Sequence, residues 1–132
     1  MIGAGALKPL RRPRLWLGLW WTAIALVVVA SLVPAFLLPQ VPGGGDKVEH
    51  FTAYCLLAAA AVQLFLSRKS VVLSGLALIA LGVALEIAQG LLTTTRQMDI
   101  QDALANTLGV VAGLLTVLTP CAGVLLTFDQ RH

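Results

Sequence analysis

The chain has 132 residues, of which 58% are hydrophobic and only 11% are charged, with a formal net charge of +3. A soluble domain of this size carries about 25% charged residues, so the composition excludes an ordinary soluble enzyme or binding module. A basic balance suggests nucleic acid in a soluble protein, but here membrane insertion accounts for it, and we expect no nucleic-acid partner.

Four long apolar blocks follow one another along the chain, and each predicts a membrane-spanning helix. The blocks are continuous rather than alternating, and backbone groups in lipid must be hydrogen-bonded within their own segment, which favours helices over strands. The predicted spans are residues 15–38, 47–66, 70–92 and 102–126. The second reaches the roughly 20 residues that a crossing needs only by including the polar turn near Asp46. The fourth contains Pro120.

These blocks predict an all-α fold, a four-helix transmembrane bundle formed by a single domain, residues 15–128. A basic N-terminal segment, residues 1–14, precedes it. The first block continues too far beyond the triplet Ala23-Ile24-Ala25 for a cleavable signal peptide. The stretch Pro39–Gly45, rich in proline and glycine, predicts a flexible turn between the first two helices. The two cysteines fall at different depths, so we expect no disulfide.

The basic residues predict how the bundle lies in the membrane. With four spans, seven of the nine lysine and arginine residues fall at one end, and only Lys47 and Arg96 fall at the other. Excess Lys and Arg mark the cytoplasmic side, so both termini are expected in the cytoplasm of a multi-pass cell-membrane protein. Of the six acidic residues, one falls at the end with seven basic residues, and five fall at the end with Lys47 and Arg96. The net charge of +3 therefore divides into +6 inside and −3 outside.

The polar side chains of three predicted spans gather at the outer end. At 100° per residue, Lys47, His50 and Tyr54 form one stripe on the second helix, and Glu86 and Gln89 lie one turn apart on the third. The stripe on the fourth helix consists of Asp99, Asp102, Asn106, Gly109 and Gly113. Small residues let helices approach closely in lipid. We therefore expect the face that carries Gly109 and Gly113 to pack on a neighbouring helix. Asp102 and Asn106 share that face, so their side chains should point toward His50 and Glu86.

Some of these residues also have purely structural interpretations. The pairs Asp46–Glu49 and Asp99–Asp102 have the spacing of capping boxes at helix starts, and Lys47 and Arg96 could simply neutralise the acids. Glu86 is the hardest to explain in this way. It lies about two turns inside an apolar helix, where a charge must be paired or neutralised. Ionisable groups at this depth usually face a bundle interior or cavity, which favours one outward-facing polar cleft.

The remaining candidates are aromatic or uncharged. Tyr54 could be an aromatic anchor at the membrane interface. Gln89 and Asn106 could serve only as hydrogen-bonding groups between helices. The three tryptophans, Trp16, Trp20 and Trp21, are predicted to face lipid or the inner membrane interface.

Three short motifs resemble those of the VanZ-like membrane protein family. The segment Asp46-Lys47-Val48-Glu49-His50-Phe51-Thr52-Ala53-Tyr54 is similar to the family's D-K-x-x-H-F-x-x-Y motif. Glu86–Gln89 is similar to E-x-x-Q, and Arg96–Gly109 to R-x-x-D-x-x-D-x-x-x-N-x-x-G. The match covers residues from about 46 to 113 in the expected order. The resemblance implies an envelope-related membrane protein with a link to glycopeptide resistance, and it supplies no reaction.

Two main functions fit this pattern. The first is a cleft that binds or modulates an envelope lipid headgroup or a lipid-linked wall precursor. Lys47 and Arg96 would hold phosphate there, because both are cations that bind it. The ligand-binding residues of this hypothesis are Asp46, Lys47, Tyr54, Gln89, Arg96, Asp99 and Asn106.

The second function is a membrane-embedded hydrolase or transferase acting on a lipid-borne phosphate or acyl substrate. His50 would be its general acid or base, with Glu86 or Asp102 tuning the imidazole. A divalent cation is a candidate cofactor, and its ligands would be Asp46, Asp99, Asp102 and His50. A transporter fits less well, because four spans contain neither inverted repeats nor broken helices. The sequence does not indicate the oligomeric state.

Overall fold

The computed structural model describes residues 6–39, 42–43 and 45–132. Residues 1–5 of the predicted N-terminal segment, and residues 40, 41 and 44 of the predicted turn, lie outside the described residues. The described chain is all-helical and has no strand beyond one isolated bridge. Its α-helices are α1 (Pro13–Leu32), α2 (Gly45–Leu64), α3 (Arg68–Leu92), α4 (Ile100–Leu115) and α5 (Val124–Arg131). Short 3₁₀ turns occupy Ala35–Leu37, Thr116–Leu118 and Pro120–Gly123.

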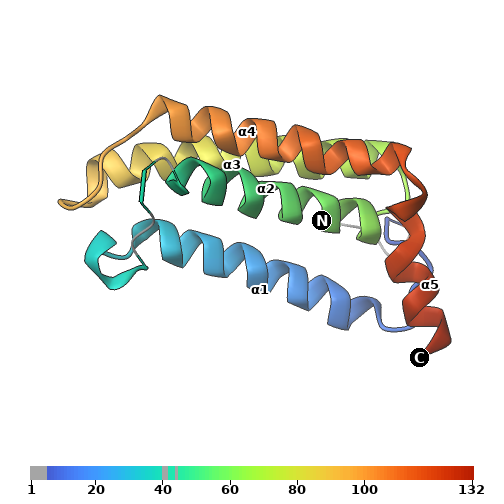
Figure 1. The fold of residues 1–132 in the computed structure, drawn as a ribbon. Helices are drawn as coiled ribbons and strands as arrows, with labels where there is room; N and C mark the ends of the chain where they lie inside the picture. The colour runs from blue at the N-terminus through green and yellow to red at the C-terminus, as the bar shows by residue number, and fades with distance from the viewer. Residues whose placement is uncertain (1–5, 40–41, 44) are drawn as a thin grey trace.

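The four long helices lie side by side and alternate in direction (Figure 1). This alternation brings the end of α1, the start of α2, the end of α3 and the start of α4 to one end of the bundle, called here the outer end. The opposite end, called the inner end, holds the start of α1 and the short helix α5, which crosses toward α1 (Figure 1). The predicted grouping of polar residues at one end depends on this arrangement.

The first helix ends at Leu32, short of the predicted boundary at residue 38. Pro34 has no amide hydrogen and disfavours helical backbone in the residue before it. Val33 is accordingly extended, with φ −70° and ψ 152°. The chain then forms the 3₁₀ turn Ala35–Leu37 over the outer end.

The fourth apolar block, predicted as one span from 102 to 126, is divided in two. The α-helix ends at Leu115, and the hydroxyl groups of Thr116 and Thr119 donate to the carbonyls of Gly113 and Thr116, both at 2.7 Å. These bonds satisfy carbonyls that the helix end leaves free. Pro120 cannot donate to a helical hydrogen bond, so α5 starts in a new direction.

The predicted close approach of the glycine face of α4 is confirmed, and its neighbour is α2. A Cβ atom on Gly109 would overlap the carbonyl oxygen of Phe51, and one on Gly113 would overlap the carbonyl oxygen of Cys55. Backbone therefore lies directly on backbone along this contact. The same rotation of α4 turns Asp102 and Asn106, which share its glycine stripe, into the bundle, where both are buried.

Three segments are long and apolar enough to cross a membrane in the described part of the chain, and they are Pro13–Leu32, Arg68–Leu92 and Ile100–Leu118. Only 6% of the best window of α1 is buried, so this helix presents apolar side chains outward almost all round. α2 has 20 residues but starts with polar turns that carry Asp46, Lys47, Glu49 and His50. The structure thus shows three candidate spans.

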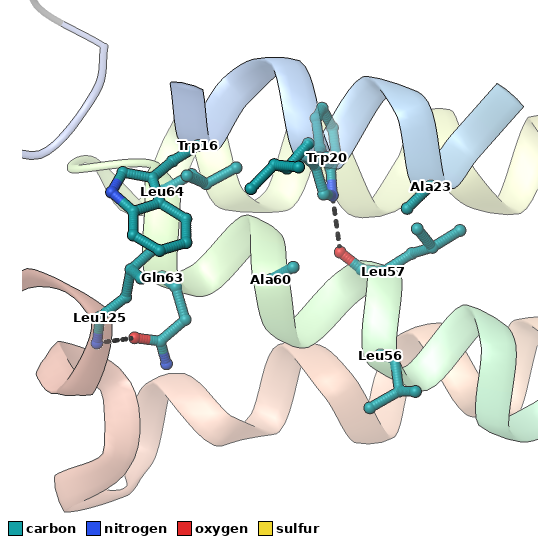
Figure 2. A pocket seen from close by; sticks show the side chains of 10 residues that line it. Trp16, Trp20, Ala23, Leu56, Leu57, Ala60, Gln63, Leu64 and Leu125 are labelled. Atoms are coloured by element: carbon teal, nitrogen blue, oxygen red, sulfur yellow. Dashed lines mark hydrogen bonds between the residues drawn. The ribbon is translucent and has the colours of Figure 1, made fainter. Parts of the chain in front are cut away.

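Trp20 is an exception to the predicted outward orientation of the tryptophans. Its side chain is buried, its Nε1 donates to the carbonyl oxygen of Leu57 at 3.0 Å, and its ring meets Phe65 edge to face. Trp21 is exposed as expected. Trp16 and Trp20 line an apolar groove of about 370 Å³ between α1 and α2 (Figure 2). The rotation of α1 on α2 decided which indole was buried.

The inner end is held by two charged side chains. Asp129 of α5 accepts from the indole N–H of Trp16 at 2.7 Å and from the backbone amides of Arg11 and Arg12, just before α1. These donors, the indole first, hold the pKa of the Asp129 carboxyl below its usual value. The Lys8 amine donates to the carbonyls of two other segments, Val62 at 2.7 Å and Ala122 at 2.5 Å. The predicted N-terminal segment is thus packed against the bundle from residue 6 onward.

Candidate functional site

A polar cavity of about 250 Å³ lies at the outer end, where three helix ends meet the turn that follows α1. Its walls combine charged and amide side chains from α2, α3, the α3–α4 connection and α4 with apolar residues of that turn. The lining residues are Ala35, Leu38, Pro39, Asp46, Glu49, His50, Gln89, Arg96, Gln97 and Asp102. The site therefore draws on α2, α3, α4 and the segments that connect the helices at this end.

Asp99 and Asp102 have different roles in the first turn of α4. Asp99 is the N-cap, and its side chain accepts from the amide of Gln101 at 2.8 Å, which satisfies an amide that the helix start leaves free. The predicted capping role of Asp99 is thus confirmed. Asp102 is buried, with its carboxylate directed toward α2, where it meets Lys47 and His50.

Lys47 is surrounded by carboxylates. Its Nζ lies 2.7 Å from Asp102, 3.0 Å from Asp99 and 3.5 Å from Asp46. A lysine ammonium has three N–H donors, and each has an acidic partner here. The ion pair with Lys47, followed by the Gln101 amide, holds the pKa of the Asp99 carboxyl below its usual value. Lys47 thus joins the starts of α2 and α4, and it could hold phosphate only by releasing a carboxylate.

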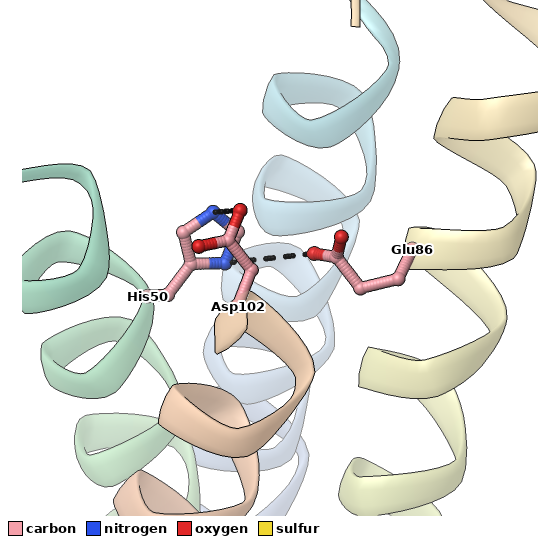
Figure 3. Close-up of side chains that lie close together, drawn as sticks. All are labelled: His50, Glu86 and Asp102. Carbon is pink, nitrogen blue, oxygen red and sulfur yellow. Dashed lines mark ion pairs between the residues drawn. The ribbon is translucent and has the colours of Figure 1, made fainter. Parts of the chain in front are cut away.

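His50 lies at the centre of the cluster. Its Nδ1 is 2.9 Å from the side-chain oxygen of Asn106 and 4.0 Å from Oε1 of Glu86. Its Nε2 is 3.7 Å from Oδ2 of Asp102. Figure 3 shows the two carboxylates approaching the ring from different helices. The convergence of these side chains, expected from the helical stripes, is present in the structure.

Glu86 also connects α3 with the start of α4. Its side chain is only 4% exposed, and its Oε2 accepts from the backbone amide of Asp99 at 3.2 Å. One turn earlier on α3, Gly82 lies against Asn106 and Tyr54, where a Cβ atom would come within 3.3 Å of both side chains. The small residue lets α3 bring its carboxylate close to the imidazole.

Arg96 lines the cavity from the α3–α4 connection. Its Nε is buried and has no hydrogen-bond partner among the described residues. The ion pairs found within the described ranges involve Lys47 and His50 but not Arg96. Its own backbone amide is held by the hydroxyl of Thr93 at 3.3 Å. The guanidinium is therefore the cation of this site that is not committed to a carboxylate.

The other predicted ligand-binding residues are distributed unevenly. Gln89 is buried and donates to the carbonyl of Ser31 at 2.8 Å, which ties α3 to the end of α1. Tyr54 is only 2% exposed, so it is not an interfacial anchor, and it lines a second cavity of about 150 Å³ beside His50 and Arg96. Asp46 lies at the exposed rim, where it contacts Lys47.

The residues best placed to hold a metal differ from the predicted set. His50, Glu86 and Asp102 each offer a ligand atom, and these atoms lie within 4.8 Å of one another. Asp99 instead caps α4 and pairs with Lys47, and Asp46 lies at the rim. Glu86 was predicted only as a catalytic group, although its position on the inward stripe of α3 was a signal for a ligand role.

The sequence did not point to Glu49, Gln97 or the turn after α1 as part of the site. Glu49 was expected to be a capping or solvated residue, yet it lines both outer cavities while staying exposed. Leu38 and Pro39 carry no chemistry that would mark them, and they reach the cavity because the helix ends early at Leu32. No family model, curated protein or solved structure matches the chain.

Proposed function

We propose that this chain is a VanZ-like, multi-pass protein of the cell membrane whose outward pocket binds the polar headgroup of an envelope lipid or a lipid-linked wall precursor. Three apolar candidate spans support the membrane assignment, and α2 would be the fourth span with its polar start inside the pocket. The strongly basic inner end supports cytoplasmic termini.

The observation that carries the proposal is the Arg96 guanidinium. It faces a polar cavity with a buried Nε that lacks a partner among the described residues. A buried donor of this kind is costly unless water or a ligand satisfies it, and the adjoining cavity gives a ligand access to it. Guanidinium groups bind phosphate through two parallel hydrogen bonds, and the side-chain amide of Gln97 lines the same cavity.

The position of the cavity favours a lipid over a small soluble anion. It opens at the end of helices whose outward faces are apolar, such as Leu91, Leu92 and Ile100, all more than 70% exposed. A ligand with its headgroup at Arg96 would have such surfaces available for its hydrocarbon chains. Lys47, with its three carboxylates, would hold the walls in place. A link to glycopeptide resistance would follow if the ligand is a wall precursor.

Lipid capture tests the proposal directly. The full chain is purified in a mild detergent, offered anionic and zwitterionic lipids, and analysed for bound lipid by native mass spectrometry. Arg96→Gln should reduce capture of anionic lipid by about ten-fold, the effect of losing one charge-assisted contact. Arg68→Gln, which removes an exposed arginine at the inner end, is the matched control. Equal capture by both variants would contradict the headgroup function.

A second candidate is a hydrolase or transferase that acts on the same lipid. It is favoured by one observation, the placement of Glu86 and Asp102 on either side of His50. A carboxylate beside an imidazole can orient it and stabilise its protonated form during proton transfer. In an enzyme, His50→Gln should abolish turnover while lipid capture persists. Capture without turnover by the unmodified chain would favour binding alone.

A further inference from the structure

The surroundings of His50 contain more hydrogen-bond acceptors than its ring can satisfy. Oxygen atoms of Asn106, Glu86 and Asp102 face the two ring nitrogens at 2.9, 4.0 and 3.7 Å. A neutral imidazole has one N–H, so the nitrogen without hydrogen presents a lone pair to a carboxylate. A proton, a water molecule or a metal ion placed against two such groups would remove their repulsion.

Each of the two carboxylates has one oxygen held by the protein and the other turned toward the ring. Asp102 uses Oδ1 for Lys47 and directs Oδ2 to His50, and Glu86 uses Oε2 for the Asp99 amide and directs Oε1 to His50. Figure 3 shows both groups aimed at the imidazole from α3 and α4. Metal sites commonly hold their ligands in this way, with outer hydrogen bonds that fix the inner atoms.

Asn106 adds a specific constraint. When its oxygen accepts from Nδ1–H, Nε2 keeps its lone pair on the side of Asp102, as a histidine ligand requires. Glu86 lies nearer to Nδ1, but the three ligand atoms still lie within 4.8 Å of one another. The charge balance points the same way, because the outer end has five carboxylates against Lys47 and Arg96. An added cation would offset part of this excess of three negative charges.

We propose that His50, Glu86 and Asp102 bind a divalent cation. One imidazole with two carboxylates favours a first-row transition metal such as Mn²⁺ or Zn²⁺ over Mg²⁺ or Ca²⁺, because the last two prefer oxygen ligands alone. The inference goes beyond the headgroup function and stands without it, since all three ligands belong to the chain itself. A cation here would also make the acidic pocket more favourable for a phosphate at Arg96.

Metal retention by the purified chain tests the inference. The protein in detergent is stripped with EDTA, incubated with Mn²⁺, Zn²⁺ or Mg²⁺ separately, desalted, and analysed for bound metal by mass spectrometry. Thermal unfolding is followed in parallel, because an ion that binds only the folded state raises the melting temperature. We expect one Mn²⁺ or Zn²⁺ per chain, a higher melting temperature with either ion, and no retained Mg²⁺.

Two ligand variants and one control identify the site. Glu86→Gln keeps an oxygen for the Asp99 amide but loses the charge, and His50→Gln removes the nitrogen ligand. Each should weaken Mn²⁺ binding at least ten-fold. Glu49→Gln removes an exposed carboxylate that lines the cavity but offers no ligand atom, and should weaken Mn²⁺ binding by far less than the ligand variants do.

The possible results distinguish a specific metal site from a cluster without metal and from general attraction of cations to the acidic rim. Unmodified chain that retains neither Mn²⁺ nor Zn²⁺ overturns the inference, whether or not the variants fold. Equal weakening by Glu49→Gln also overturns it, since it indicates attraction to the acidic rim. Lipid capture by Arg96→Gln reports on the headgroup function independently, because Arg96 is outside the ligand set.

Discussion

The two ends of the bundle both contain ionisable side chains, but they use them differently. At the inner end, Asp129 is matched by three N–H donors and Lys8 by two carbonyl oxygens. Each group there joins segments distant in sequence, and each is satisfied by the fold. This is how polar groups behave when their role is structural.

The outer end is not balanced in this way. His50 faces more acceptors than it can satisfy, and the Nε of Arg96 lacks a partner in the described part of the chain. A cavity of about 250 Å³ adjoins both residues. The comparison teaches that charge and burial alone do not mark a site, since Asp129 is as buried as Glu86. What distinguishes the outer end is the mismatch between its hydrogen-bond donors and acceptors.

The largest effect should come from separating α2 and α4, because their contact supports both ends. Gly113→Val places a side chain against the backbone of Cys55 and should destabilise the protein by about 3 kcal/mol or more. Thermal unfolding in detergent would show the loss, together with loss of lipid capture. Gly18→Val is the control, since a Cβ there meets open space. A normal melting temperature for Gly113→Val would contradict the contact.

A pair of carboxylate substitutions should separate the two ends. Asp102→Asn removes the nearest of the three carboxylates around Lys47 and the carboxylate that faces Nε2 of His50. Because these contacts hold the pocket walls together, the change should lower anionic lipid capture about ten-fold or more. Asp129→Asn should lower the melting temperature and leave capture unchanged, because it lies at the other end. Both properties are measured on each purified variant. The comparison fails if Asp129→Asn impairs capture as strongly as Asp102→Asn.

Acid should weaken the inner end through Asp129. Its pKa is held below the ordinary value of 3.8 by the Trp16 indole, then by the Arg11 and Arg12 amides, so the unfolded chain binds more protons between the two pKa values. The stabilisation is complete above pH 3.8 and is lost as the pH falls through the lower folded value. Melting temperatures measured from about pH 6 to about pH 3 should therefore decline in the acidic part.

Asp129→Asn should flatten that decline without removing it. Asp99 at the outer end has a lowered pKa as well, because of Lys47 and the Gln101 amide, and it contributes with the same sign. An unchanged acid profile in Asp129→Asn would show that the inner carboxylate does not stabilise the fold.

The smallest effect on stability is expected from a substitution in the middle of the bundle, where Trp20 of α1 contacts α2. Trp20→Phe removes the hydrogen bond to the Leu57 carbonyl while keeping an aromatic ring, and should cost about 1 kcal/mol or less. Thermal unfolding should show a small decrease in melting temperature. The same change at exposed Trp21 should have no effect. A larger decrease in melting temperature for Trp21→Phe than for Trp20→Phe would contradict the burial of Trp20.

The sequence by itself determined the helices and which residues share an end. Continuous apolar blocks leave helix as the favoured backbone in lipid, and their alternation assigns each polar cluster to one end. The spacing of Gly109 and Gly113 determined which face of α4 packs closely and therefore which carboxylate turns inward. These properties are local and periodic, so they can be read without coordinates.

Only the tertiary structure decided how the polar side chains are paired. Whether Lys47 contacts acids or a ligand, whether Glu86 meets the Asp99 amide, and whether Trp20 is buried all depend on helix rotation and depth to within a few ångströms. The crossing of α5, which brings Asp129 to the start of α1, depends on the direction taken after Pro120. Helical periodicity assigns a residue to a face, but distances between faces arise from packing of the whole bundle.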